Sequence, residues 1–136
     1  MPSHRLHRLG DLQLAILRVL WTRGEATAGE VQAALARERG LALTTIATML
    51  KRMSAQKIVA HRAEGRVHVY RALAGEADVR SSMVSDLVRR VFRGDSAALV
   101  THLVDEGDVR PADLDDLRAA VKRRKARRST GGRRDA

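Results

Sequence analysis

Residues 44–56 of the chain read TTIATMLKRMSAQ, and their apolar side chains recur with the spacing of an amphipathic helix. Ile46, Met49, Leu50 and Met53 occupy positions i, i+3, i+4 and i+7, which lie on one face of a helix. The sequence therefore predicts a helix over residues 44–56 that buries this face in a small core.

The opposite face of this helix carries small hydroxyl side chains at its start and long cations towards its end. Its members are Thr44, Thr45, Thr48, Lys51 and Arg52. Hydroxyl groups let the backbone approach bases and phosphates, and Lys and Arg reach further. This composition suits a helix that enters the major groove of DNA with its N-terminus first. Alternatively, this face could simply be exposed to solvent without binding anything. The basic segment that follows favours DNA binding over that alternative.

The residues after this helix, 57–71, change from helical spacing to β-prone segments on either side of a turn at residues 63–66. We expect a β-hairpin that carries Arg62 and Arg66 near its tip. These cations could contact DNA phosphates, or they could only discourage pairing of the exposed strand edge. We favour the phosphate contact by a small margin.

Two helices are expected before residue 44. Residues 9–22 show a broad apolar stripe that ends at Arg23-Gly24, and residues 27–39 begin with a capping box of Thr27 and Glu30 and end before Gly40. Three helices followed by a basic hairpin is the order of a winged helix-turn-helix. We therefore predict a mainly α fold with a small β-hairpin, with the winged-helix domain over residues 6–73.

Helical spacing returns after residue 76, with short amphipathic helices expected over 78–93, 96–106 and 111–125. These helices have little of their own chain to pack against, so a partner subunit is the simplest place to bury their apolar faces. We expect a helical dimerisation region over residues 76–121. Its interface residues would be Met83, Leu87, Val91, Phe92, Leu99, Val100, Leu103, Leu114 and Leu117.

Charge is distributed unevenly along the chain, whose formal net charge is +10. Residues 1–75 hold 12 Lys and Arg against 5 Asp and Glu, residues 76–121 hold 6 against 10, and residues 122–136 hold 8 against 1. A surface that neutralises phosphates must be cationic, so the first segment is the expected DNA-binding part. We expect the basic tail, 122–136, to be disordered, and either to attract DNA without sequence preference or only to aid solubility.

Two groups of side chains could suggest a metal or carboxylate site. His61 and His68 would lie opposite each other if Glu64-Gly65 formed a two-residue loop, but two histidines without a third ligand make a poor metal site. The acids Asp113, Asp115 and Asp116 follow Pro111 in the first turn of an expected helix, where the helix dipole favours them. We therefore expect no metal and no cofactor.

Composition excludes several classes of protein. The chain of 136 residues contains no cysteine, which removes disulfides and thiolate zinc sites. It shows no apolar run long enough to span a bilayer and no signal peptide, which fits a cytoplasmic protein that contacts no membrane. No nucleophile–base pair, phosphate loop or metal spacing is present, so we do not expect an enzyme. Its three aromatic residues, Trp21, Tyr70 and Phe92, are expected in the core or an interface.

Three segments resemble the penicillinase-repressor (BlaI/MecI/CopY) family. They are the pattern LxxLxxxILxxLW from Leu9, the helix TTIATMLKRM, and the strand GRVHVY that follows the turn. The similarity covers roughly residues 6–121. It implies a homodimeric repressor of transcription that binds a twofold-symmetric DNA operator. The recognition-helix positions of the family match Thr44, Thr45, Thr48, Lys51 and Arg52, and the wing positions match Arg62 and Arg66 more loosely.

The chain departs from that family pattern in three places. Leu43 stands where many relatives have an aromatic residue. Some relatives are inactivated by a membrane sensor protease that cuts an Asn-Phe bond, and the aligned pair here is His102-Leu103. The copper-responsive branch senses metal through C-terminal cysteines, which this chain lacks. From another functional class, a winged helix that binds protein, or one that coats chromosomes without sequence preference, remains the rival interpretation.

Overall fold

The computed structural model describes residues 6–135, with side chains described from residue 6 to residue 128. The chain divides into two compact units, the first ending at Leu87 and the second beginning at Val88. No helix among the described residues is both long and apolar enough to cross a membrane.

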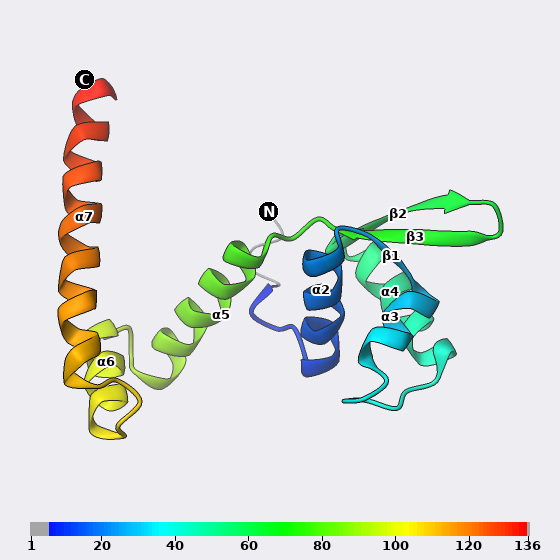
Figure 1. Cartoon of the computed structure of the whole chain (residues 1–136), viewed down its shortest axis with the longest axis horizontal. Helices are drawn as coiled ribbons and strands as arrows, with labels where there is room; N and C mark the ends of the chain where they lie inside the picture. The colour runs from blue at the N-terminus through cyan, green and yellow to red at the C-terminus, as the bar shows by residue number, and fades with distance from the viewer. Residues whose placement is uncertain (1–5, 136) are drawn as a thin grey trace. The chain divides into compact units, whose positions relative to one another are not determined.

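Three helices build the core of the first unit: α2 (Asp11–Arg23), α3 (Ala28–Leu35) and α4 (Leu43–Ala55) (Figure 1). Their apolar stripes meet, and Ile16, Leu17, Val31, Ile46 and Leu50 are completely buried. The expected helix over 44–56 is present with its predicted inner face. The second helix is shorter than the expected range 27–39, because it ends at Leu35.

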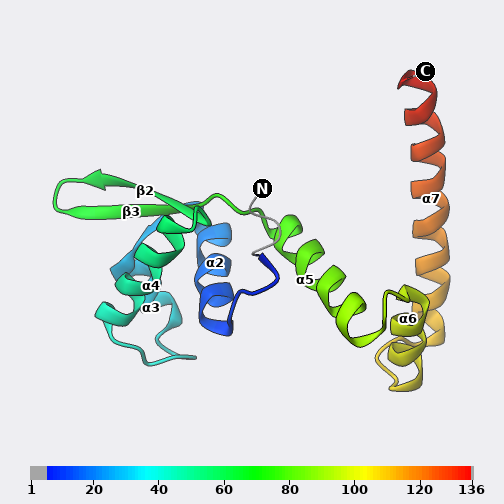
Figure 2. The same cartoon turned by 180° about the vertical axis from the view of Figure 1, so that it is seen from behind.

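A three-stranded antiparallel sheet completes this unit, with β1 (Ala26–Thr27), β2 (Val59–Glu64) and β3 (Val67–Ala72) in the order β1-β3-β2. The hairpin of β2 and β3 extends beyond the helices of this unit, and α4 lies next to its base in both views (Figures 1 and 2). The strand β1 was not expected, because two residues between helices are too few to show any alternation.

The hairpin turn differs by one residue from the loop considered from the sequence. Glu64 pairs with Val67, so Gly65 and Arg66 form the turn, and His61 pairs with Tyr70 instead of His68. Gly65 has a φ of 64°, whereas Arg66 does not have a positive φ. A single positive φ at the first turn position is the pattern of a type II′ turn, which favours glycine there.

Helix α5 (Glu76–Val91) begins in the first unit and ends in the second. Its Val79 is a fully buried member of the winged-helix core, and Met83 packs partly buried against that core. Met83 was expected in the dimer interface, and since it is only partly covered within its own chain, that role stays a prediction. The first compact unit extends to Leu87, beyond the expected boundary near residue 76. The reason is that the first turns of α5 bury their apolar side chains within the same chain.

The second unit contains α6 (Ser96–Asp105) and α7 (Pro111–Asp135). The Asp95 carboxylate caps α6 by accepting a 3.1 Å hydrogen bond from the Ala98 amide. Helix α7 continues through the basic segment to Asp135, where the sequence had suggested a disordered tail. The side chains of residues 129–135, and residue 136, lie outside the described part of that segment.

Candidate nucleic-acid interface

The outer face of α4 presents all five residues predicted to contact DNA. Thr44, Thr45, Thr48, Lys51 and Arg52 are each exposed. The inner face of the same helix is completely buried at Ile46, Leu50 and Met53. Because the inner face is fixed in the core, the position of the outer face is set by the fold and not by flexible side chains.

The N-terminus of α4 is electrostatically suited to an anion. Ala42 is the N-cap residue and provides no side-chain cap, and the first turn of this fully described helix contains no acidic residue. The amides of Thr45 and Ile46 already bond to the Ala42 carbonyl at 3.1 and 3.2 Å. The amides before them have no partner within the helix, and the helix dipole places partial positive charge at this end.

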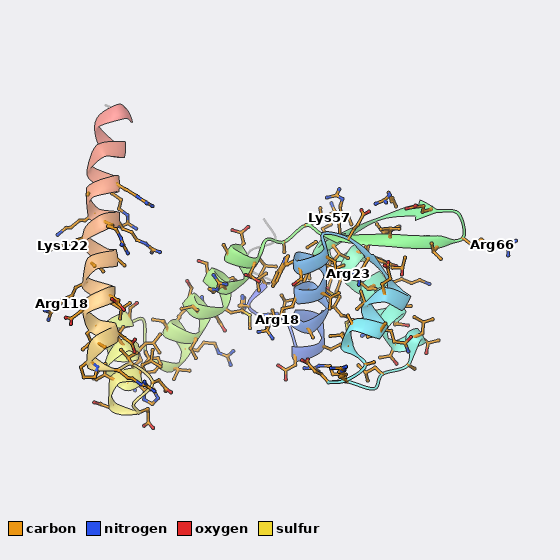
Figure 3. All side chains as sticks on the ribbon, in the orientation of Figure 1. Arg18, Arg23, Lys57, Arg66, Arg118 and Lys122 are labelled. Carbon is orange, nitrogen blue, oxygen red and sulfur yellow. The ribbon has the colours of Figure 1, made fainter. Side chains whose placement is uncertain are left out.

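The two cations expected on the wing have different surroundings. Arg66 stands at the free end of the hairpin and points away from the rest of this unit (Figure 3). Arg62 is held by carboxylates: its guanidinium lies 2.5 and 3.0 Å from the two Glu25 oxygens and 2.9 Å from a Glu64 oxygen. The hydrogen bonds from Arg62 lower the pKa of the Glu25 carboxyl, and the same bonds to Glu25 raise the pKa of Arg62.

A ring cluster lies on one face of the hairpin. The His61 and His68 rings stack with their centroids 4.8 Å apart, and the Tyr70 ring lies 5.8 Å from His61. The two histidines do not pair directly across the strands, but they are diagonal neighbours on the same face of the sheet, so their rings can still stack. His61 Nδ1 also shares a 2.8 Å hydrogen bond with Ser54 Oγ, which connects the hairpin to the end of α4. No group of three metal-ligating side chains occurs among the described residues.

Sequence reasoning missed two residues near this surface. Lys57 is an exposed cation between α4 and β2 with a φ of 61°, a value that glycine usually supplies. Glu25 precedes β1, and its role as the partner of Arg62 depends on a contact 37 residues apart in sequence. No local pattern marks either residue.

Comparison with known proteins assigns the family. The sequence model of the penicillinase repressor family matches residues 9–123. The chain belongs to the penicillinase repressor family. It is 34% identical over 119 residues to the transcriptional regulator BlaI of Mycobacterium tuberculosis, covering 86% of this chain and 85% of that one. It is 17% identical over 116 residues to the methicillin resistance regulatory protein MecI of Mammaliicoccus sciuri, covering 85% and 94%.

Two solved structures are similar to parts of this penicillinase repressor family member. One is the DNA-binding domain of the repressor BlaI, with a TM-score of 0.48, 30% identity, and coverage of 54% of this chain and 89% of that one. The other is the antimony-specific repressor AntR, with a TM-score of 0.45, 17% identity, and coverage of 63% and 73%. The family contains transcriptional repressors, so the chain is a transcriptional repressor and not an enzyme.

None of the residues that the sequence assigned to dimerisation in this repressor is fully buried within the chain. Among the described large apolar side chains, the most exposed are Val121 at 63%, Val91 at 62% and Val67 at 50%, and Leu73 and Leu117 follow at 48% and 47%. Helix α6, described along its whole length, contains no buried residue at all. Leu87 and Val100 are exposed, while Phe92, Leu99, Leu103 and Leu114 are half-buried.

The pair His102-Leu103 lies inside α6, one turn before the end of the helix. Its His102 ring lies 5.9 Å from the Phe92 ring. Proteases bind extended backbone, so cleavage of this bond would require local unfolding of α6.

Proposed function

We propose that the protein represses transcription as a homodimer on a twofold-symmetric DNA operator, with α4 of each subunit in one major groove. The observation that carries this proposal is the arrangement of α4. Five residues of DNA-binding chemistry share its exposed face, and the opposite face is anchored in the core. Twofold symmetry requires that the two copies of α4 lie about 34–36 Å apart, or a multiple of that distance, along the duplex.

Within α4, the three threonines and the two cations would have different tasks. Thr44, Thr45 and Thr48 lie in the first half of the helix, where short side chains allow close approach to base edges and phosphates. Lys51 and Arg52 lie in the last turns and would reach further along the groove. Loss of an arginine that contacts a base edge costs about 1–3 kcal/mol and relaxes sequence preference at that base.

On the wing, Arg66 is the cation placed to reach a phosphate or the minor groove. It lies in the hairpin turn and is exposed, and it takes part in none of the ion pairs among the described residues. Arg62 was predicted to act with it, but two carboxylates already occupy the Arg62 guanidinium. In the proposed complex Arg66 is therefore the main phosphate contact of the wing.

Dimerisation would bury the apolar residues that α5, α6 and α7 leave exposed. Of the ten exposed large apolar residues in the described chain, seven lie between Val84 and Val121. Soluble proteins rarely leave such a concentration uncovered, and two copies of one surface can cover each other. The acidic composition of residues 76–121 would keep this region away from the phosphates.

The proposal can be tested by selecting binding sites from random duplexes and footprinting the product. A palindromic site with one dimer bound is the expected result. Lys51→Ala and Arg52→Ala should each weaken binding to that site by roughly tenfold or more, as loss of a base or phosphate contact implies. Arg18→Ala removes an exposed cation from α2 and serves as the matched control.

Three results would contradict the proposal. Equal affinity for all duplexes would indicate a chromosome-coating protein. No affinity for any duplex would indicate a winged helix that binds protein. Unchanged affinity in both α4 variants would remove α4 from the interface even if the protein binds DNA.

A further inference from the structure

Arg62 is the focus of a three-residue ion network on the outer face of the hairpin. Both terminal nitrogens of its guanidinium engage Glu25, and one also contacts Glu64 at 2.9 Å. Arg62 thus donates two hydrogen bonds to the Glu25 carboxylate, and one of the same two nitrogens also donates to Glu64. Such fork-shaped pairing is the strongest geometry available to an arginine.

The strand register explains how these residues meet. Arg62 on β2 pairs with Val69 on β3, and Val69 pairs with Thr27 on β1, so the three side chains share one face of the sheet. Glu25 directly precedes β1. Because β3 lies between β1 and β2, the Arg62 side chain reaches across β3 to contact Glu25. Val69 is only 8% exposed although it is not a member of the main core.

The network removes the effective charge of Arg62. Two carboxylates surround one guanidinium, and Arg71 also acts electrostatically on Glu25. The two positive charges of Arg62 and Arg71 balance the two negative charges of Glu25 and Glu64. Arg66 is then the hairpin cation whose charge this network does not balance. A phosphate presents paired oxygens much as a carboxylate does, so Glu25 occupies the guanidinium surface that a phosphate would use.

We propose that Glu25 and Glu64 form a carboxylate clamp that keeps Arg62 from binding DNA phosphates and so limits the affinity and the salt dependence of the repressor for DNA of any sequence. Phosphate contacts raise affinity for every sequence alike, whereas base contacts from α4 discriminate among sequences. By holding one wing cation out of the interface, the clamp lowers the affinity for operator and for unrelated DNA by a similar factor and leaves the discrimination between them to α4. This inference rests on the proposed function, because it assumes that the hairpin lies beside DNA.

Stabilisation of the fold alone is a weak explanation for the clamp. Arg62, Glu25 and Glu64 have side chains that are 52%, 49% and 63% exposed. Ion pairs this exposed contribute little to stability, since water and salt screen them.

The test uses the full chain carrying Glu25→Gln, which keeps the size of the side chain and removes its charge. Binding is measured at several salt concentrations to the selected operator duplex and to an unrelated duplex of equal length. We expect the unrelated duplex to bind several-fold more tightly. The slope of log affinity against log salt should steepen by about 0.9, the value for one added phosphate contact. The operator duplex should bind more tightly by a similar factor, so the ratio of the two affinities should stay nearly constant.

The Arg23–Glu30 pair provides a matched control, because it is also an exposed ion pair of the first unit, with a 2.7 Å contact. Glu30→Gln changes the net charge by the same amount without affecting Arg62. A second control places Glu25→Gln in an Arg62→Ala background, where the slope should no longer steepen.

Two results would overturn the clamp. One is an equal effect of Glu25→Gln and Glu30→Gln on the salt slope, and the other is weaker binding of Glu25→Gln to both duplexes, which would make the network only a support for the wing. Elution from immobilised heparin gives a readout that needs no operator. Glu25→Gln should elute at higher salt than Glu30→Gln, and equal elution also overturns the clamp. If the wild-type protein prefers no duplex, the proposed function fails while the heparin comparison still decides on the clamp.

Discussion

The Trp21 indole Nε1–H donates a 2.9 Å hydrogen bond to the carbonyl of Ala74, across 53 residues of sequence. Trp21 lies in α2, and Ala74 lies in the short connection between β3 and α5. This bond, together with buried Val79, ties the start of α5 to the winged-helix unit. The helix that leads to the second unit is therefore anchored in the first.

Substitution of Trp21 by Phe should destabilise the first unit. An aromatic ring remains, but the Ala74 carbonyl loses its partner, which costs about 0.5–1.5 kcal/mol for a neutral hydrogen bond. Urea unfolding of the variant and the wild type measures the difference. Phe92→Leu, which changes an aromatic residue of the second unit, is the control for a general loss of aromatic packing. An unchanged urea midpoint in Trp21→Phe would mean that a hydrogen bond from water to the Ala74 carbonyl fully replaces the one from the indole.

The sequence predicted the first unit well because helical periodicity and capping residues act locally. The stripe of Ile46, Leu50 and Met53 defines both faces of α4, and the capping box of Thr27 and Glu30 is present in the structure. What the sequence could not predict depends on distant pairing. The two-residue strand β1 and the Glu25–Arg62 contact arise from packing between segments far apart in the chain. The one-residue shift of the hairpin turn is the local exception, because Gly65 takes the first turn position with a positive φ. The sequence also did not predict that Met83 packs partly against the core of its own chain, because an apolar face does not indicate which partner covers it.

Lys57→Gly should stabilise the protein. Lys57 has a φ of 61°, which costs an L-residue roughly 1–2 kcal/mol, while glycine adopts it freely at some cost in unfolded-state entropy. The net gain should be about 0.5–1 kcal/mol in thermal or urea unfolding. Lys57→Ala removes the same charge without relieving φ and should give no gain. Equal stability of the two variants would show that backbone strain at this position has no energetic consequence.

Arg62→Ala should raise the pKa of Glu25 towards its ordinary value. Hydrogen bonding from Arg62 is the largest cause of the lowered pKa in the folded state. A carboxyl with a depressed folded pKa stabilises the fold above its unfolded pKa, and this contribution is lost as pH falls through the folded pKa. Carbon-detected NMR titration of both carboxyls measures the change. Glu30 is the internal control, since its pKa is lowered chiefly by the Thr27 backbone amide and should not respond.

Serine substitutions on the second unit should weaken dimerisation. Val91→Ser and Leu117→Ser place a hydroxyl on surfaces that are 62% and 47% exposed within one chain. If a partner buries them, each substitution costs about 1–3 kcal/mol of association, because apolar burial is removed. Sedimentation over a concentration series measures the shift towards monomer. Val67→Ser, at a hairpin residue that is 50% exposed, should leave the dimer intact. Equal sedimentation of all three variants would place the dimer contacts elsewhere.

Deletion of residues 123–136 should lower the salt dependence of DNA binding while leaving sequence preference unchanged. The apolar residues of α7, Leu114, Leu117 and Val121, all precede the deletion, so the dimer should persist. The described cations of the deleted segment, from Arg123 to Arg128, are exposed and can only act through charge. For each phosphate that the tail neutralises, its removal should reduce the slope of log affinity against log salt by about 0.9. Salt titrations of the full chain and the deletion on operator and unrelated duplexes separate the two roles considered for this segment. An unchanged slope would show that the basic end of α7 does not touch DNA, and would leave solubility as its role.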